Sequence, residues 1–372
     1  MAGITPIVMP KWGLSMKEGT VTAWLVEEGT EISVGMPILE VETDKIANAV
    51  EAPDPGMLRR RVADEGELLP VKALLGVLAG DDVSDADIDA YIASYVMPTI
   101  EDEGEDAGPA YLYIEVDGIR VRYARKGSAE GTPVLFIHGY GGDLDNWLFN
   151  IDAVGEKNPV IALDLPGHGQ SDIKLPGASI AALAGFIASF MDTIAVERAH
   201  LVGHSMGAAI ATQLSLDAPK RVASLTLIGS AGFGSDINNG YTDGFASASS
   251  RRELKPVLEL LFADPSLVSR QLVDDVLKYK RLDGVSELLS ELGGALFGGG
   301  KQSEQPGLKL GNSTTDRPVL VIWGRDDQII SVKQASNAPS GATVEIFDGA
   351  GHMAQMERAN DVNRLIIRHV GG

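Results

Sequence analysis

The stretch AlaHisLeuValGlyHisSerMetGlyAlaAla at residues 199–209 decides the fold of most of this chain. A β-like apolar run comes first, and a helix-like run begins after Ser205. GlyHisSerMetGly (203–207) between them is the Gly-x-Ser-x-Gly pattern of a tight turn from strand to helix. Its glycines leave room for a strained serine whose hydroxyl stands at the sheet edge. The pattern predicts a nucleophile at Ser205, and a serine that only caps a helix is the alternative.

Strand-like runs on both sides of this turn extend the pattern over the rest of the chain. From about residue 133 they alternate with helix-length segments such as 178–196 and 206–217, which predicts an α/β fold with a mostly parallel sheet. The rhythm stops between about 232 and 315, where glycine-rich pieces surround helical stretches such as 251–263 and 266–292, so we expect an inserted cap there. The predicted strands lie near 111–117, 120–124, 133–137, 159–163, 199–202, 223–228, 318–323 and 343–347.

Three further stretches supply the groups that a catalytic serine needs. ValLeuPheIleHisGlyTyrGlyGly (134–142) ends an early strand in glycines, where the backbone N–H of Tyr140, with that of Met206, would point at a developing oxyanion. ValLeuValIleTrpGlyArgAspAsp (319–327) ends a strand in two carboxylates, and PheAspGlyAlaGlyHisMetAlaGln (347–355) supplies a histidine after the last strand. The chain order is therefore serine, acid, base.

Residues from about 111 to 370 resemble the α/β-hydrolases throughout, and the AspLeuProGlyHisGlyGlnSer loop at 164–171 is part of the resemblance. The resemblance implies that Ser205 is the nucleophile and His352 the general base and then acid. It also implies that Asp327 is the carboxylate that orients the imidazole.

Asp326 is the alternative acid. The family usually uses the residue three positions after the glycine, which from Gly324 is Asp327, and Asp326 would then cap the turn. The other histidines within family motifs are expected to support loops; they are His138, His168 and His204.

The overall composition excludes several classes of function. The 372 residues include 31 basic and 52 acidic side chains, a net charge of −21 that disfavours nucleic acid and anionic membranes as partners. The chain has no cysteine, which excludes thiolate chemistry, and no spacing of histidines and carboxylates suggests a metal site. No apolar run approaches the roughly 18 residues of a membrane span, and the start lacks a signal-peptide pattern. We therefore expect a cytoplasmic protein without a metal.

The first 80 residues follow a different pattern. Short alternating runs such as ThrValThrAlaTrpLeuVal (20–26) and ProIleLeuGluValGluThr (37–43), punctuated by glycines, predict a small all-β module. Asp44 and Lys45 fall between two β-like runs, where a hairpin turn would hold the ammonium group of Lys45 out in solvent. Such a lysine is either merely solvated or a site of modification.

The motifs around this lysine favour modification. MetProLysTrpGlyLeuSerMet (9–16), GluThrAspLys (42–45) and AlaProAspProGly (52–56) resemble the lipoyl domains of 2-oxo acid dehydrogenase complexes in order and spacing. A related biotin carrier would have methionines on both sides of its lysine, whereas Asp44 and Ile46 flank Lys45. The resemblance therefore implies that Lys45 carries lipoic acid as an amide.

An acidic stretch joins the two regions. Residues 81–110 carry ten acidic and no basic side chains, which favours an extended, solvated linker spanning roughly 30 Å. Ile88, Ile92, Tyr95 and Val96 have helical spacing, so a short docked helix is the alternative. The predicted organisation is a lipoyl carrier domain at 1–80, the linker at 81–110 and an α/β-hydrolase-fold domain at 111–372.

The two halves together resemble the acetyltransferase components of acetoin dehydrogenase complexes. The resemblance implies that an acetyl group passes from S-acetyl-dihydrolipoyl Lys45 through Ser205 to coenzyme A. It also implies three partners: a thiamine diphosphate-dependent acetoin-cleaving component, a dihydrolipoyl dehydrogenase and a lipoate-attaching enzyme. Two alternatives stay open: a hydrolase of esters, thioesters or C–C bonds that the lipoyl module docks to a complex, and a carrier with an inactive hydrolase-like scaffold.

Overall fold

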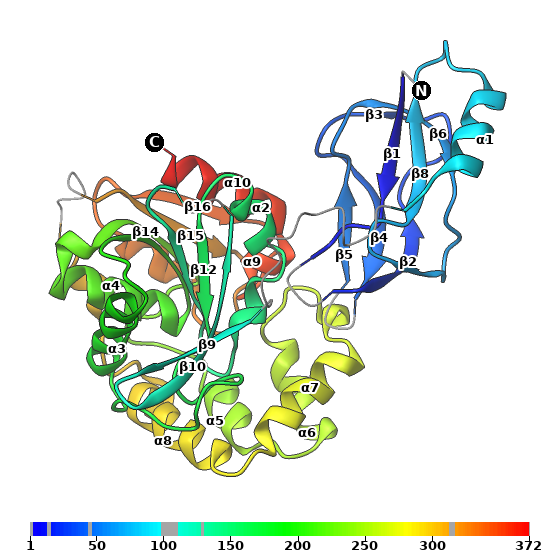
Figure 1. The fold of residues 1–372 in the computed structure, drawn as a ribbon. Coiled ribbons are helices and arrows are strands. Elements are labelled where there is room, and N and C mark those ends of the chain that lie inside the picture. Colours follow the sequence, from blue (N-terminus) through cyan, green and yellow to red (C-terminus); the bar gives the residue numbers. More distant parts are fainter. Residues whose placement is uncertain are drawn as a thin grey trace. The chain divides into compact units, whose positions relative to one another are not determined.

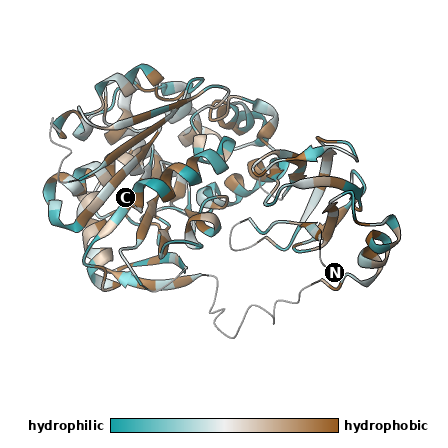
Figure 2. Cartoon of the chain, turned by 90° about the horizontal axis from the view of Figure 1, so that it is seen from above, coloured by the Kyte–Doolittle hydropathy of each residue, from teal (hydrophilic) through white to brown (hydrophobic). Residues whose placement is uncertain are grey.

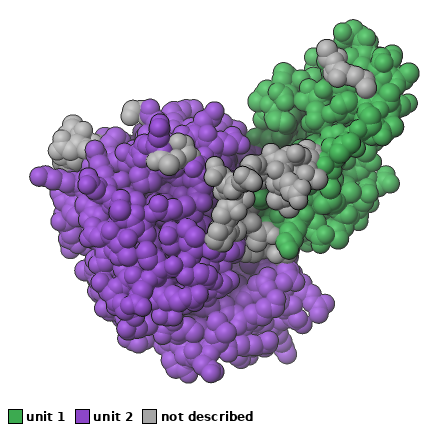
Figure 3. Space-filling view, viewed as in Figure 1, with its two compact units in different colours: residues 1–109 green, residues 110–372 purple. Residues whose placement is uncertain are grey.

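The computed structural model divides into two compact units, residues 1–109 and 110–372 (Figures 1 and 3). The described residues are 3–12, 16–43, 47–97, 111–127, 130–311 and 317–371.

The first unit is built from two four-stranded antiparallel sheets. In spatial order, one sheet holds β1 (Ile4–Val8), β8 (Leu74–Ala79), β6 (Gly56–Arg61) and β3 (Glu31–Ile32). The other holds β5 (Ala47–Glu51), β4 (Pro37–Glu42), β2 (Glu18–Trp24) and β7 (Leu68–Pro70). Alternating apolar residues of both sheets form one core, which includes the fully buried Val21, Leu39, Leu58 and Leu75. This unit is the expected small all-β module.

Part of the range predicted as a linker is helical. Helix α1 (Asp85–Ser94) begins at Ser84, whose side chain accepts from the backbone N–H of Asp87. Ile88 is completely buried and joins an apolar cluster with residues of β8. This face of β8 is apolar and gains a cover from α1, which explains why an acidic segment folds. The extended interpretation is therefore wrong for residues 85–94, and the short docked helix is correct; residues 98–110 lie outside the described residues.

The second unit is organised around an eight-stranded sheet. Strands β11 to β16 are parallel to their neighbours within the group, whereas β10 pairs antiparallel with both β9 and β12. In spatial order the strands are β16 (Thr343–Phe347), β15 (Val319–Gly324), β14 (Val222–Ile228), β13 (Ala199–His204), β11 (Val134–Ile137), β12 (Val160–Leu163), β10 (Ile119–Lys126) and β9 (Leu112–Val116). All eight predicted strands are present.

Helices cover both faces of this sheet, so its central strands are apolar and buried along their whole length. Figure 2 shows the resulting concentration of hydrophobic residues in the strands. Helices α3 (Ile180–Thr193) and α4 (Met206–Asp217) lie on one face, and α2 (Ile151–Gly155) and α10 (Ala359–Val370) lie on the other (Figure 1). Short α9 (Ala354–Glu357) precedes α10.

Four helices interrupt the sheet between β14 and β15, where the sequence predicts a cap. They are α5 (Asn239–Ser247), α6 (Arg251–Glu259), α7 (Arg270–Lys280) and α8 (Val285–Phe297). The helical stretch predicted at 266–292 is two helices, because Gly284 adopts a left-handed conformation with φ of 86° immediately before α8. The predicted fold class, a small all-β domain plus an α/β fold with inserted helices, is confirmed. Within the described ranges, no helix has the length and apolar character needed to cross a bilayer.

Candidate active site

Ser205 occupies the sharp turn between β13 and α4. Its φ of 55° and ψ of −118° are strained for a residue with a side chain, at a cost of about 1–3 kcal/mol. The turn is possible because the positions two residues before and two residues after Ser205 are glycine. A Cβ on Gly203 would lie 2.5 Å from the carbonyl oxygen of Gly207, and one on Gly207 would lie 2.2 Å from that of Ile137. The local sequence therefore holds the serine at the carboxyl end of the sheet, as the pattern predicts.

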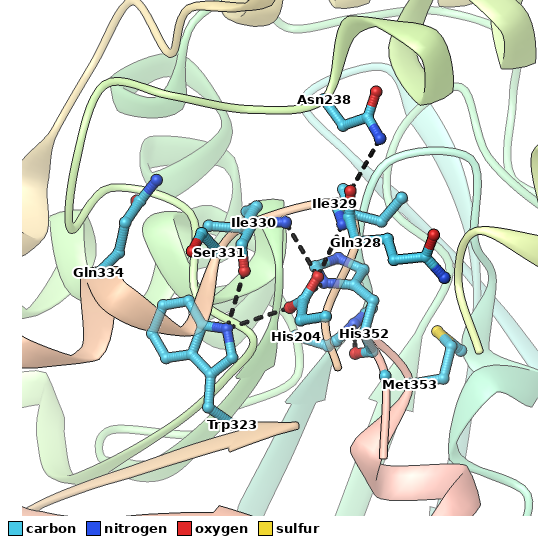
Figure 4. A network of polar contacts seen from close by, with 12 residues as sticks. His204, Asn238, Trp323, Gln328, Ile329, Ile330, Ser331, Gln334, His352 and Met353 are labelled. Atoms are coloured by element: carbon cyan, nitrogen blue, oxygen red, sulfur yellow. Dashed lines mark hydrogen bonds and ion pairs between the residues drawn. The ribbon is translucent and has the colours of Figure 1, made fainter. Parts of the chain in front are cut away.

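Asp327 follows β15, and its buried side chain accepts four hydrogen bonds from residues that are labelled in Figure 4. Its Oδ1 accepts from the backbone N–H groups of Ile329 at 2.8 Å and Ile330 at 2.9 Å. Its Oδ2 accepts from Trp323 Nε1 at 3.0 Å and from His352 Nδ1 at 2.8 Å. These hydrogen bonds fix the orientation of the carboxylate and offset the free-energy cost of burying it.

His352 lies between this carboxylate and the pocket. Because Asp327 can only accept, Nδ1 of His352 carries the proton and Nε2 is left as the basic nitrogen. The imidazole is buried, and the backbone N–H of His352 donates to the carbonyl of Leu261 at 2.8 Å. Asp326, the alternative acid, is exposed. Of the two candidate carboxylates, Asp327 contacts the histidine.

A neighbouring histidine supports the position of His352. His204 Nε2 donates to the carbonyl oxygen of His352 at 2.9 Å, and the two rings are 4.7 Å apart (Figure 4). Burial holds the pKa of His204 well below its usual value, so this ring stays neutral beside the base. His204 therefore acts as the structural support that the sequence predicts.

Ser205 and His352 line one pocket with about 590 Å³ of empty space, including its open mouth. The walls are mostly apolar. The glycine-rich loop after β11 contributes Gly139, Tyr140, Gly141 and Gly142, and the segment after β16 contributes Met353 and Met356. The inserted helices and the segments beside them contribute Tyr241, Phe245, Leu258, Leu261, Phe262, Leu272 and Val276. The structure thus brings the predicted nucleophile, the predicted base and the predicted oxyanion loop to one cavity, and the predicted acid lies behind the predicted base.

The predicted oxyanion loop packs directly on the nucleophile. A Cβ added to Gly139 would lie 3.0 Å from Cβ of Ser205. The buried Tyr140 hydroxyl donates to the carbonyl of Leu289 in α8 at 2.7 Å, and burial raises its pKa. In the part of the chain that the structure describes, the backbone N–H groups of Tyr140 and Met206 donate to no protein acceptor. Both are therefore available to a ligand.

The histidines at 138 and 168 brace the loops around the site. His138 Nδ1 donates to the carbonyl of Gly139 at 2.8 Å, while its Nε2 accepts from the N–H of Leu165 at 2.9 Å. His168 Nδ1 donates to the carbonyl of Pro166 at 3.0 Å. Burial lowers the pKa of His138 to about 4 and that of His168 to about 3, so both are neutral supports at neutral pH.

Lys45, the predicted attachment site, lies outside the described residues, as do Asp44 and Ile46. The hairpin around it is described: β4 and β5 pair antiparallel, with Glu42 opposite Ala47. The two strands that flank Lys45 in the sequence are therefore paired with each other. Among the described residues, no group of histidines and carboxylates could hold a metal ion.

Two parts of the site were not predicted from the sequence. Trp323 lies inside the motif at 319–327, four residues before Asp327, but a tryptophan on a buried strand is expected to be an ordinary residue of the hydrophobic core. The apolar wall that α5, α6 and α7 contribute carries no local motif. The spacing of apolar residues in a helix predicts which face is buried, but it does not predict which part of the protein that face packs against.

Comparisons with known proteins agree with this geometry. Residues 132–359 match the model of the alpha/beta hydrolase fold, and residues 5–78 match that of biotin-requiring enzymes, the biotin/lipoyl model. The chain is 64% identical over 369 residues to the dihydrolipoyllysine-residue acetyltransferase component of the acetoin cleaving system of Cupriavidus necator, covering 99% of this chain and 98% of that relative. The chain belongs to this family. The family's protein of the same description from Pseudomonas putida is 45% identical over 99% of the chain and 98% of its own length. The resemblance predicted from the motifs is confirmed.

Among solved structures, a meta-cleavage product hydrolase from Pseudomonas fluorescens IP01 aligns with a TM-score of 0.63 and 26% identity. The alignment covers 70% of this chain and 97% of the hydrolase. The larger unit thus shares its fold with nearly the whole of this hydrolase.

Proposed function

We propose that this chain is an acetyltransferase that moves an acetyl group from S-acetyl-dihydrolipoyl Lys45 to coenzyme A, within an acetoin dehydrogenase complex. The observation that carries the proposal is the buried Asp327–His352 pair, whose histidine lines an apolar pocket together with the strained Ser205. This pocket belongs to a chain that also contains a lipoyl domain. The description of the relatives from C. necator and P. putida supports the same reaction.

In the first half of the reaction, Ser205 Oγ attacks the thioester carbonyl and His352 Nε2 takes the hydroxyl proton. The N–H groups of Tyr140 and Met206 donate to the oxyanion that forms. As the carbon–sulfur bond breaks, His352 returns its proton to the departing thiolate. Ser205 then carries the acetyl group as an ester.

In the second half, His352 takes the proton from the thiol of coenzyme A, and the resulting thiolate attacks the acetyl-serine carbonyl. The same N–H groups stabilise the second oxyanion, and His352 gives the proton back to Ser205 as the ester bond breaks. Asp327 holds the imidazole in the required tautomer and stabilises it while it is protonated.

The proposed organisation has three parts: a carrier domain at 1–80, an acidic segment at 81–110 whose helix α1 packs on the carrier, and the hydrolase-fold domain at 111–372. The antiparallel pairing of β4 with β5 supports the attachment of lipoic acid at Lys45, because Lys45 falls between these two strands in the sequence. We assign three partners from this chemistry: a lipoate-attaching enzyme, a thiamine diphosphate-dependent acetoin-cleaving enzyme and a dihydrolipoyl dehydrogenase. We place the reaction in the cytoplasm.

The test is the fate of the acetyl group. The chain is lipoylated, its reduced arm is acetylated, and acetyl-coenzyme A and acetate are quantified with and without coenzyme A. We expect acetyl-coenzyme A as the main product, and its loss in Ser205→Ala. Acetate formed at an equal rate without coenzyme A would show a thioester hydrolase instead.

The likeness to a meta-cleavage product hydrolase favours one alternative, in which the larger unit cleaves an ester, thioester or C–C bond and the lipoyl module only docks it. The same experiment separates this alternative, because hydrolysis needs no coenzyme A. A pure carrier with an inactive scaffold would be indicated if Ser205→Ala left turnover of the complex unchanged while Lys45→Arg abolished it.

A further inference from the structure

A buried lysine of the cap has no part in the proposed chemistry. Lys280 is the last residue of α7 and is only 6% exposed. Its ammonium group donates to the carbonyl oxygens of Phe245 and Ala246, the latter at 3.1 Å, in the last turn of α5. Carbonyls at the C-terminus of a helix attract a cation, and burial without such partners would cost several kcal/mol. Lys280 therefore ties the end of α7 to the end of α5.

The same ammonium group lies 4.9 Å from the centre of the Phe245 ring. A cation at this distance from an aromatic ring is attracted to it. Phe245 is thus held through both its backbone carbonyl and its side chain, which restricts the motion of this residue more than apolar packing alone.

Phe245 is also one of the residues of α5 that contact the predicted oxyanion loop. A Cβ added to Gly141 would lie 2.4 Å from an edge carbon of the Phe245 ring. The rings of Phe245 and Tyr140 pack edge to face at 5.8 Å, and both residues line the pocket with Ser205. A displacement of Phe245 would therefore open the wall of the pocket beside the loop.

A second contact links α5 to the loop. Tyr241 lines the pocket, and its hydroxyl lies 3.4 Å from the carbonyl oxygen of Tyr140, the outer limit for a donated hydrogen bond. The Tyr241 and Phe245 rings are 5.7 Å apart on the same helix. The position of α5 thus affects Tyr140, the residue whose backbone N–H is proposed to stabilise the oxyanion.

We propose that Lys280 is a positioning residue that locks α5, and with it Phe245, against the oxyanion loop, so that the acetyl-serine is shielded from water until coenzyme A attacks. This inference rests on the proposed function. According to this inference, the cap determines whether coenzyme A or water accepts the acetyl group from Ser205. Attack by the thiolate yields acetyl-coenzyme A, and attack by water yields acetate and returns a proton to Ser205.

The informative quantity is the ratio of acetyl-coenzyme A to acetate, since a loss of folded protein lowers both products equally. Lys280→Met keeps most of the side-chain length and removes the charge and the donors. We expect the ratio of acetyl-coenzyme A to acetate to fall by about tenfold. This effect is smaller than the roughly 10²-fold loss of rate that follows when a reacting group is misplaced by 1 Å. Lys280→Arg restores most of the ratio, because a guanidinium group also donates to two carbonyls.

The matched control is Lys278→Met on the same helix, since Lys278 is largely exposed and paired with Asp275. It should leave the ratio unchanged. Phe245→Leu tests the same wall with Lys280 intact and should lower the ratio in the same direction. An unchanged ratio in Lys280→Met, or an equal fall with Lys278→Met, would overturn the inference. The proposed function itself fails in a distinguishable way, because the wild-type chain would then form no acetyl-coenzyme A.

Discussion

The two units of the chain differ in what they bury. Among the described residues, the buried polar side chains of the first unit are limited to Thr43, while the second unit buries many, including four of its histidines and the Arg122–Asp164 ion pair. All six histidines of the sequence lie in the second unit. Buried polar groups are costly unless they are paired, so a fold retains them where fixed geometry is useful. The difference teaches that the described core of the first unit is almost entirely apolar, whereas that of the second unit also holds polar groups in fixed positions.

The largest expected effect separates the two units directly. Ser205→Ala should reduce acetyl transfer by at least about 10⁴-fold with any donor, because it removes the nucleophile. Lys45→Arg should abolish turnover of the lipoylated complex but leave transfer from free S-acetyl-dihydrolipoamide unchanged. Acetyl-coenzyme A formation from both donors is the measurement. If Ser205→Ala retained activity with the free donor, the chemistry would not depend on the second unit's serine.

Asp327→Asn tests the fixed carboxylate. We expect kcat to fall by about 10⁴-fold, because an amide can present its N–H to His352 and favour the wrong tautomer. Asp326→Asn is the control, since that neighbouring side chain is exposed, and it should change kcat less than twofold. Comparable losses in the two variants would contradict the assignment of Asp327.

The positions of the three candidate triad residues could be predicted from sequence because each of them follows a strand in a short turn. At Ser205 the turn needs glycines at fixed positions, and Gly203 and Gly207 have no room for a side chain. Constraints of this kind act between residues close in the chain, so they leave a pattern that can be recognised.

The cap wall and α1 could not be predicted in the same way. Phe245 becomes a wall of the pocket only because α5 packs on a loop about 100 residues earlier, near Gly141. Residues 85–94 are strongly acidic, and their helix depends on Ile88 finding an apolar patch on β8. Both outcomes depend on tertiary contacts, which override local composition.

The contrast in histidines predicts different responses of the two units to acid. His138 is fully buried with its pKa lowered to about 4, against about 6.5 in an unfolded chain. Between these values the unfolded state binds more protons, so stability falls as the pH falls through this window. For His138 alone the loss is about 2 kcal/mol at pH 5 relative to neutral pH, and His168 shifts in the same direction.

Calorimetry at pH 7.5 and pH 5 checks this prediction. The unfolding transition of the second unit should move to lower temperature at pH 5, whereas that of the first unit, which has no histidine, should move much less. His138→Gln is the matched variant, and its transition should depend less on pH. Equal shifts of the two units would mean that the general charge of the chain, rather than its buried histidines, sets the acid response.

The smallest expected effect concerns two buried tryptophans of the second unit, Trp323 and Trp147. Trp323 Nε1 donates both to Asp327 Oδ2 and to the carbonyl of Ile330, each at 3.0 Å, whereas Trp147 Nε1 has no partner among the described residues. Trp323→Phe removes one of four donors from the carboxylate that orients His352. The negative charge of Asp327 is then balanced by fewer donors, so it stabilises the protonated imidazole of His352 more strongly. We expect kcat to fall about tenfold, the scale of a hydrogen bond to a charged group, and the acid limb of the pH–rate profile to move to higher pH.

Trp147→Phe makes the same change of side chain without losing a hydrogen bond. Its ring packs 4.8 Å from that of Phe136, a contact that phenylalanine can largely keep. This variant should therefore leave both kcat and the pH–rate profile close to those of the wild type. A pH profile that does not move in Trp323→Phe, or moves equally in Trp147→Phe, would reduce Trp323 to a packing residue. A shift of the pH–rate profile in Trp323→Phe alone would show that a buried polar group of the second unit acts on the chemistry through Asp327. The difference between the two units would then be measurable at a single hydrogen bond.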